Sequence, residues 1–290
     1  MLAALAVPAA STPPVTYRHV VELRPTTLDD LPALHGLFVA AIAGVFEPHA
    51  FEPPGPGLEA FANQQRHILE TGTSVVAEDR GRLLGFGASW QRDEHWFLAS
   101  LFVDQAAQGG GVGAALLDAV WGAAPRRRTI TDAIQPVSNA LYGRHGLIPA
   151  TPILTFTGRP QSDGRELRPE EADLAAIDLA AYGFDRAIDH AYWERYGVRT
   201  TWPGAYTYTF PGGAIGPVAG LDSAAAARAL AAELARADGE VRLRIPGTSR
   251  TLVEVALAAG LRLDPVPGLL LLSETVTPPT ALAIAGYMLF

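Results

Sequence analysis

A glycine-rich turn between an apolar strand and an amphipathic helix constrains this chain more than any other feature. Residues 101–117 read LFVDQAAQGGGVGAALL. Glycine opens backbone conformations that are closed to other residues and lets the main chain come close to a bound group. The helix that follows directs unpaired N–H groups and the positive end of its dipole at the turn. The segment therefore predicts a binding site for a pyrophosphate.

Two common phosphate loops can be compared with this turn. The P-loop of ATP- and GTP-binding proteins needs a lysine after its last glycine, and the chain contains no lysine. A Rossmann loop fits loosely, because Gly109, Gly111 and Ala114 have its spacing and Asp132 lies near the position of the acid that binds a ribose. A nucleotide-binding oxidoreductase is thus an alternative that the loop alone leaves open.

The residues before the loop argue against the Rossmann interpretation. Rossmann glycines follow the first strand of a parallel βαβ unit. Here the apolar runs 74–78 and 83–90 flank the turn sequence DRGR, which predicts a hairpin, and a third run at 95–103 leads into the glycines. The pattern predicts an antiparallel meander before the phosphate loop.

A meander followed by such a loop resembles the GCN5-related N-acetyltransferase (GNAT) superfamily. The acyl-CoA loop of that family reads Gln/Arg-x-x-Gly-x-Gly/Ala, and Gln108, Gly111 and Gly113 match it. A strand predicted at 129–134 precedes a second motif, in which Asn139 and Tyr142 lead to a Gly-Leu pair as in the family's Asn-to-Tyr segment, in slightly compressed form. The resemblance covers roughly residues 20–158 and implies acetyl-CoA as the cofactor.

The resemblance also implies roles for particular residues. In the family a bulge separates two central strands and the pantetheine arm lies between them, which assigns backbone contacts to Leu101, Phe102 and Val103. A backbone N–H there would hold the developing oxyanion. Asn139 would contact the pantetheine arm or cap its helix, and Tyr142 would contact the same arm and protonate the departing thiolate. The pyrophosphate would be bound by Gln108, Gly109, Gly110, Gly111, Val112 and Gly113.

The general base departs from the family pattern. Many acetyltransferases carry a glutamate on the strand before the loop, but the corresponding position here is Phe97, which cannot accept a proton. His95 and Glu94 are the nearest titratable residues, and an ordinary pKa near ~6.5 favours His95. The surrounding sequence QRDEH is typical of an exposed polar turn, so proton loss to water is the alternative.

An internal repeat divides the chain. The sequence ELRPTTLDDL at residue 22 recurs as ELRPEEADL at residue 166. We expect a disordered extension at 1–18, a GNAT domain at 19–158, a linker at 159–165 and a degenerate GNAT-like domain at 166–290. Each module is expected to be α/β (α+β), with a mixed, mostly antiparallel central sheet flanked by helices.

The second copy lacks the glycine loop. Its corresponding segment contains Pro217, which has no N–H to donate, and an alanine-rich helix that Asp222 can cap without a ligand. We therefore expect a single acyl-CoA site, in the first module. The second module is expected to contribute structure and part of an acceptor pocket.

The amino-acid composition excludes several kinds of catalysis and partner. The absence of cysteine excludes thiol catalysis and thiolate metal sites, and a net charge of −8 argues against nucleic acid as the main partner. We expect no metal and no membrane association, a cytoplasmic location, and a monomer or homodimer. The predicted function is transfer of an acetyl group to a primary amine of a small molecule or peptide. A non-catalytic acyl-CoA sensor or scaffold is the alternative.

Overall fold

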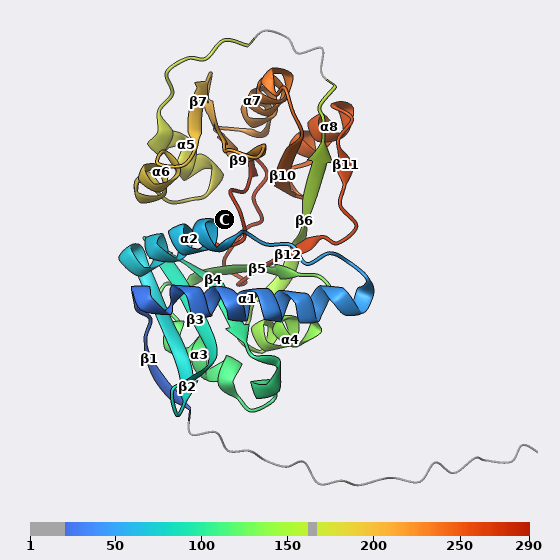
Figure 1. Ribbon diagram of the computed structural model, residues 1–290. Coiled ribbons are helices and arrows are strands. Elements are labelled where there is room, and N and C mark those ends of the chain that lie inside the picture. Colours follow the sequence, from blue (N-terminus) through green and yellow to red (C-terminus); the bar gives the residue numbers. More distant parts are fainter. Residues whose placement is uncertain (1–20, 162–166) are drawn as a thin grey trace, which may run out of the picture.

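The computed structural model describes residues 21–161 and 167–290 (Figure 1). The extension predicted at 1–18 lies outside the described residues. So does the part of the predicted linker 159–165 that begins at residue 162. The division into two sequence modules stays a prediction.

The predicted antiparallel meander is present. Its strands are β1 (Glu22–Pro25), β2 (Gly72–Asp79), β3 (Arg82–Arg92) and β4 (His95–Val103), and each pairs with the next. The β2–β3 hairpin turns through Arg80 and Gly81, whose φ angles of 52° and 78° are those that a tight hairpin turn requires. β4 then pairs in parallel with β5 (Arg126–Asp132).

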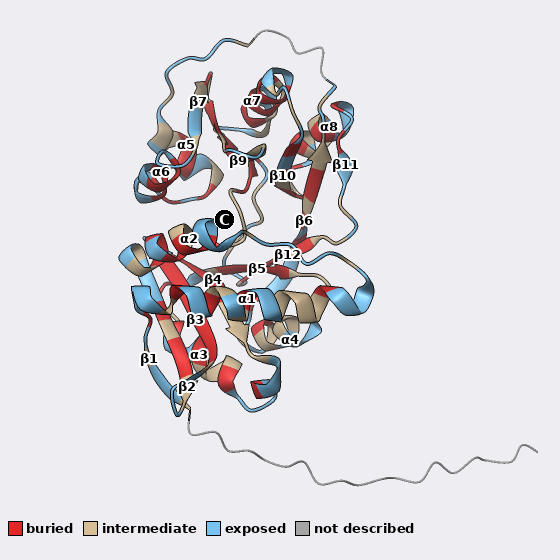
Figure 2. Ribbon diagram, viewed as in Figure 1, coloured by how far each residue is buried: buried red, intermediate tan, exposed pale blue. Residues whose placement is uncertain are grey.

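Helices cover both faces of this part of the sheet. Alternate residues of β4 divide between the two sides, since Phe97 packs in the core beneath α1 (Leu31–Phe46) and α2 (Leu58–Thr71), whereas Leu98 packs in the core beneath α3 (Val112–Val120) and α4 (Pro136–Arg144). Burial is concentrated on the central strands (Figure 2). The alternation follows from the strand period of two.

One described segment, Leu28–His49, is long and apolar enough to cross a membrane by length and composition alone. Its mean hydropathy is 1.5, and 22% of the window is buried in the protein. Leu31, Leu34 and Phe38 of this segment pack into the core. Core helices of soluble proteins pass the same test, and the expected absence of membrane association stays a prediction.

The second half of the chain is also built of strands and helices. It contains α5 (Leu174–Ala181), α6 (Ala187–Trp193), β7 (Val198–Trp202), β8 (Ala205–Thr209), β9 (Ala214–Gly220), α7 (Ser223–Arg236), β10 (Val241–Pro246), α8 (Arg250–Ala258), β11 (Arg262–Leu263), β12 (Gly268–Leu272) and β13 (Leu282–Ala283). Asp222 caps α7 as predicted, because its Oδ1 accepts a hydrogen bond from the N–H of Ala225 at 2.7 Å. The apolar run at 281–289 forms only the two-residue strand β13.

The two halves share one sheet through an exchange of strands. The order is β1-β2-β3-β4-β5-β12-β6-β10-β9-β8-β7, so β12 of the second half lies between β5 and β6 (Ile148–Gly158) of the first. β6 pairs with β12 along its first half and with β10 along its second half. Neither sequence half therefore carries a complete sheet. The fold is a mixed, mostly antiparallel α/β architecture flanked by helices, as predicted.

Candidate active site

A gap opens between β4 and β5 in the middle of the sheet. The two strands pair only from His95 to Leu98 on β4, and Ala99 is an extra residue in the ladder with β3, which is a β-bulge. Beyond the bulge β4 stays paired with β3, and β5 stays paired with β12. One backbone edge of each strand is consequently free to bind an extended group. Leu101, Phe102 and Val103 lie beyond the bulge and line the cleft.

The glycine loop closes one end of the gap. Asp104 starts a 3-10 turn. Gly109 and Gly111 have φ angles of 79° and 87°, which residues other than glycine rarely adopt. The backbone N–H groups of residues 109–114 donate no hydrogen bond to the described residues. Gln108 is exposed, and its Nε2 donates to the carbonyl of Val103 at 3.2 Å. The loop is therefore tied to the end of β4 and presents a row of donors.

The second motif lies beside the gap on α4. Tyr142 is 4% exposed, lines the cleft and packs against Leu98 and Leu271. Burial raises the pKa of its phenol above the ordinary value, so the hydroxyl stays protonated. Asn139 does not line the cleft. Its Nδ2 donates to the carbonyl of Asp132 at 3.3 Å, and its buried Oδ1 has no partner among the described residues.

The structure separates His95 from the other predicted site residues. His95 is buried, not exposed in a polar turn, and it is absent from the walls of the cleft. Its Nδ1 lies 2.6 Å from Nη2 of Arg128, and burial together with Arg128 and Arg126 lowers its pKa to about 4. A histidine in this position packs against Phe184 and serves the core. Phe97, at the family's glutamate position, is likewise fully buried.

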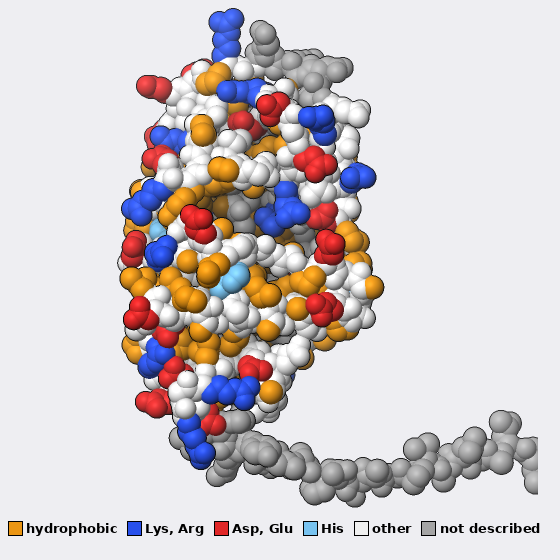
Figure 3. All heavy atoms as spheres, viewed as in Figure 1, with side chains coloured by type: hydrophobic (Ala, Val, Ile, Leu, Met, Phe, Trp, Pro, Cys, Tyr) orange, Lys and Arg blue, Asp and Glu red, His pale blue; other side chains and the backbone are white. Residues whose placement is uncertain are grey.

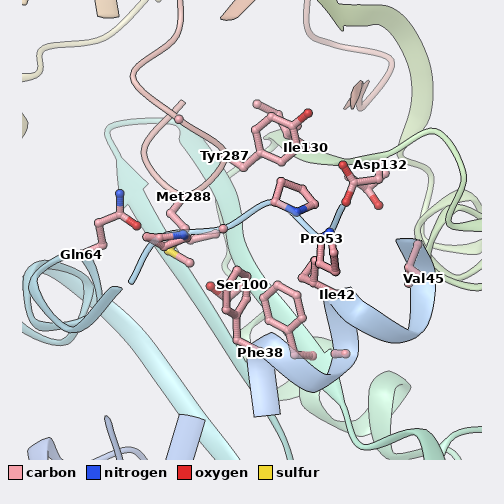
Figure 4. A pocket seen from close by; sticks show the side chains of 18 of the residues that line it. Phe38, Ile42, Val45, Pro53, Gln64, Ser100, Ile130, Asp132, Tyr287 and Met288 are labelled. Atoms are coloured by element: carbon pink, nitrogen blue, oxygen red, sulfur yellow. The ribbon is translucent and has the colours of Figure 1, made fainter. Parts of the chain in front are cut away.

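A cleft of about 1400 Å³ extends from the gap to the second module. Figure 3 shows the corresponding hollow on the molecular surface between the two halves of the chain. Figure 4 shows its interior, where Phe38 and Ile42 from α1 lie opposite Tyr287 and Asp132. The cleft thus joins the predicted thioester position to side chains of the second half.

Asp132 is a titratable residue of the cleft that was not among the candidate bases predicted from the sequence. It ends β5 at the gap, and its pKa is raised to about 6 by burial, which the nearby Arg244 partly offsets. A carboxylate with such a pKa can accept a proton near neutral pH. The sequence signal is a lone acid within the predicted strand 129–134, interpreted from the sequence only as a ribose-binding acid. Among the described residues no group of three or more His, Cys, Asp or Glu side chains is arranged to hold a metal ion.

Splayed central strands, a glycine loop before α3 and a tyrosine helix after β5 define a GNAT-type acetyltransferase fold. Residues 40–147 match the family model for the acetyltransferase (GNAT) family. These residues belong to that family, and the whole chain has a tandem GNAT fold.

Several solved structures superimpose on nearly the full length of this chain. A putative acetyltransferase from Pyrococcus horikoshii superimposes with a TM-score of 0.75 at 16% identity, covering 97% of this chain and 100% of that one. A GCN5-related N-acetyltransferase from Sphaerobacter thermophilus gives a TM-score of 0.60 at 17% identity, covering 90% and 97%. A tandem GNAT protein from the clavulanic acid biosynthesis pathway gives 0.53 at 13% identity, covering 89% and 99%. No curated protein matches the sequence. At these identities the likeness shows the fold.

Proposed function

We propose that this protein transfers an acetyl group from acetyl-CoA directly to the amine of a small molecule or peptide. The observation that carries the proposal is the gap between β4 and β5, which ends at a loop of unpaired N–H groups and opens into a large cleft. A non-catalytic scaffold would have no use for a cleft of this size beside the gap.

The residues around the gap fit acetyl-CoA. The N–H groups of residues 109–114 would hold the pyrophosphate at the start of α3. The free edges of β4 and β5 would pair with the amide groups of pantetheine, and Asn139 holds the end of β5 through its hydrogen bond to the carbonyl of Asp132. Acetyl-CoA supplies an activated acetyl thioester.

The chain's own groups can assist each part of the transfer. Backbone N–H groups on the free edge of β4 would stabilise negative charge on the carbonyl oxygen. The amine nitrogen forms a bond to the carbonyl carbon as the carbon–sulfur bond breaks. Asp132 would accept the proton that the amine loses, and the protonated hydroxyl of Tyr142 would donate a hydrogen bond to the sulfur that leaves as a thiolate.

Thermal unfolding with and without acetyl-CoA tests the binding step. At a hundredfold excess over Kd, we expect stabilisation of about 2.7 kcal/mol, which corresponds to a rise in Tm of roughly 5 °C. Gly110→Glu should abolish this rise by placing a carboxylate in the anion site. Gly110 is a better target than Gly111, because its φ is not positive and a Cβ there would approach only the carbonyl of Ala107, at 3.4 Å.

Gly36→Glu is the matched control. Gly36 lies on α1, and a Cβ there would meet nothing within 4 Å. This variant should keep the full rise in Tm. Incubation of the wild type with labelled acetyl-CoA and a panel of amines tests catalysis, because a sensor would bind without producing an acetylated amine. An absent shift in the wild type would refute acetyl-CoA binding.

A further inference from the structure

Three polar side chains face one end of the cleft without a hydrogen bond to the described protein. They are Asp132 at the end of β5, Arg244 on β10, and Tyr287 in the C-terminal segment. None of their side-chain atoms has a hydrogen-bond partner in residues 21–161 and 167–290, and no ion pair joins Asp132 to Arg244. All three are half-buried in the wall of the cleft, where their polar atoms stay open to a bound group, so the cluster can bind a polar ligand.

The strand exchange places Asp132 and Arg244 on the same face of the sheet. Asp132 is in register with Gly268 of β12, which is in register with Ile153 of β6. Two residues further along β6, Thr155 pairs with Arg244. Directly paired residues share a face, as do residues two apart on one strand, so all five positions point to the side occupied by α1 and α2.

Tyr287 lies between the two charged groups. A Cβ at Gly268 would come within 2.2 Å of the Tyr287 hydroxyl oxygen, so the phenol occupies the space that the glycine leaves. The guanidinium of Arg244 lies 5.7 Å from the centre of the Tyr287 ring. Figure 4 shows Tyr287 and Asp132 on the same side of the cleft. The three groups therefore form one polar wall.

The other charged residues in this wall form no ion pair with Asp132 or Arg244 in the part of the chain that the structure describes, which leaves both side chains available to bind a ligand. Asp264 also lines the cleft, but its Oδ1 already accepts a hydrogen bond from Oγ1 of Thr157 at 3.0 Å. Arg242 is exposed to solvent. Burial lowers the pKa of Arg244 and raises that of Asp132, which indicates that each charge lacks full compensation.

We propose that the acceptor is an amino acid, with its amino group at Asp132 and its carboxylate at Arg244 and the Tyr287 hydroxyl. This inference rests on the proposed acetyl transfer. A guanidinium matches a carboxylate with two parallel hydrogen bonds, and Asp132 lies at the gap where the thioester would be. The opposite wall, formed by Phe38, Ile42 and Val45, is apolar and would face the amino acid side chain.

A comparison of matched acceptors tests the proposal. Amino acids with apolar side chains are assayed beside the amines that they would become without the carboxylate, for example leucine beside 3-methylbutylamine. Acetylation of the amino acid should have a kcat/KM at least about tenfold higher, because charge-assisted hydrogen bonds contribute about 1.5–3 kcal/mol. In Arg244→Gln the KM for the amino acid should rise about 10- to 100-fold relative to the KM for the decarboxylated amine, since any effect of the lost charge on Asp132 acts on both acceptors alike.

Arg228→Leu is the control, because Arg228 is an exposed cation on α7, remote from the cleft, and its loss should alter neither KM. Arg244→Lys keeps a charge without the planar fork and should lie between the wild type and Arg244→Gln. Equal use of both acceptors by the wild type, or an equal loss for both in Arg244→Gln, would overturn the amino acid assignment. Protection by acetyl-CoA with no acetylation of any amino acid would overturn it as well. Absence of acetyl-CoA protection would instead refute the proposed function on which it rests.

Discussion

Asp132 has surroundings that suit a proton acceptor. Asp132 is half-buried and its carboxylate accepts no hydrogen bond from the described residues, so its charged form is only partly compensated by Arg244. The result is a pKa of about 6, well above that of an ordinary aspartate. Phe97, at the family's base position, and His95, a nearby titratable candidate, are both buried in the core.

The pH dependence of acetyl transfer should report this carboxylate. Below about pH 6 Asp132 is protonated and cannot accept a proton, so kcat/KM should rise with pH through about 6 and then level off. Asp132→Asn should lower kcat by about 10²-fold or more and remove the inflection near pH 6. Steady-state rates between pH 5 and 8 measure both effects.

The control for this prediction is a neighbouring acid. Asp264 faces the same end of the cleft as Arg244 and Tyr287, but it is bonded to Thr157. Asp264→Asn should retain the inflection. If the inflection persisted in Asp132→Asn, another group would be the proton acceptor.

At the scale of single residues the sequence predicted the cofactor side of the site better than the acceptor side. Gln108, Gly109 and Gly113 line the cleft because they belong to one contiguous motif whose geometry is local. His95 was predicted to be exposed, but the segment between α5 and α6 covers it, where Gly183 lies against its ring and the Phe184 ring is tilted against it. Arg244 and Tyr287 carried no local signal, because their approach to Asp132 depends on pairing between distant strands.

At the scale of elements, the antiparallel meander and the helix that Asp222 caps follow from periodicity and turn residues. Strand β12 is the exception in its position. Its run of leucines is typical of a buried strand, but periodicity does not say which edge the strand joins. It fills the place between β5 and β6, where Leu270 packs with the α1–α2 core and Leu271 with the α3–α4 core.

The exchange predicts that the first half cannot fold alone. Residues 1–161 made by themselves would leave β5 and the first half of β6 without the neighbour they share, exposing unpaired edges and apolar core. We expect this fragment to aggregate or to lack cooperative unfolding, and to gain no protection from acetyl-CoA. Adding a separately produced fragment 162–290 should restore both properties. A soluble fragment 1–161 that bound acetyl-CoA would show that β12 is dispensable.

At the scale of the whole molecule, a buried polar network joins the two halves. Asp189 of α6 is fully buried and accepts hydrogen bonds from Nε2 of His67 at 2.9 Å, Nη2 of Arg92 at 3.0 Å and Nε of Arg186 at 3.1 Å. Arg186 in turn donates to the main-chain oxygens of Leu289 and Phe290. These partners hold the pKa of Asp189 below its ordinary range despite burial. The network fixes α6 and the C-terminal segment, which together line the cleft.

Removal of the Asp189 carboxylate should therefore lower the free energy of unfolding of the whole molecule rather than of one module. Asp189→Ala leaves Arg186 and Arg92 buried without their carboxylate, and loss of one partner of a buried ion pair costs about 3–5 kcal/mol. Urea unfolding followed by tryptophan fluorescence and by far-UV circular dichroism should show this loss, with the two signals still coincident because the sheet is continuous. Asp118→Ala is the control, since that carboxylate is 71% exposed and its removal should change the free energy of unfolding by less than about 0.5 kcal/mol. A similarly small change in Asp189→Ala would mean that apolar packing alone, without the buried ions, holds the two halves around the cleft.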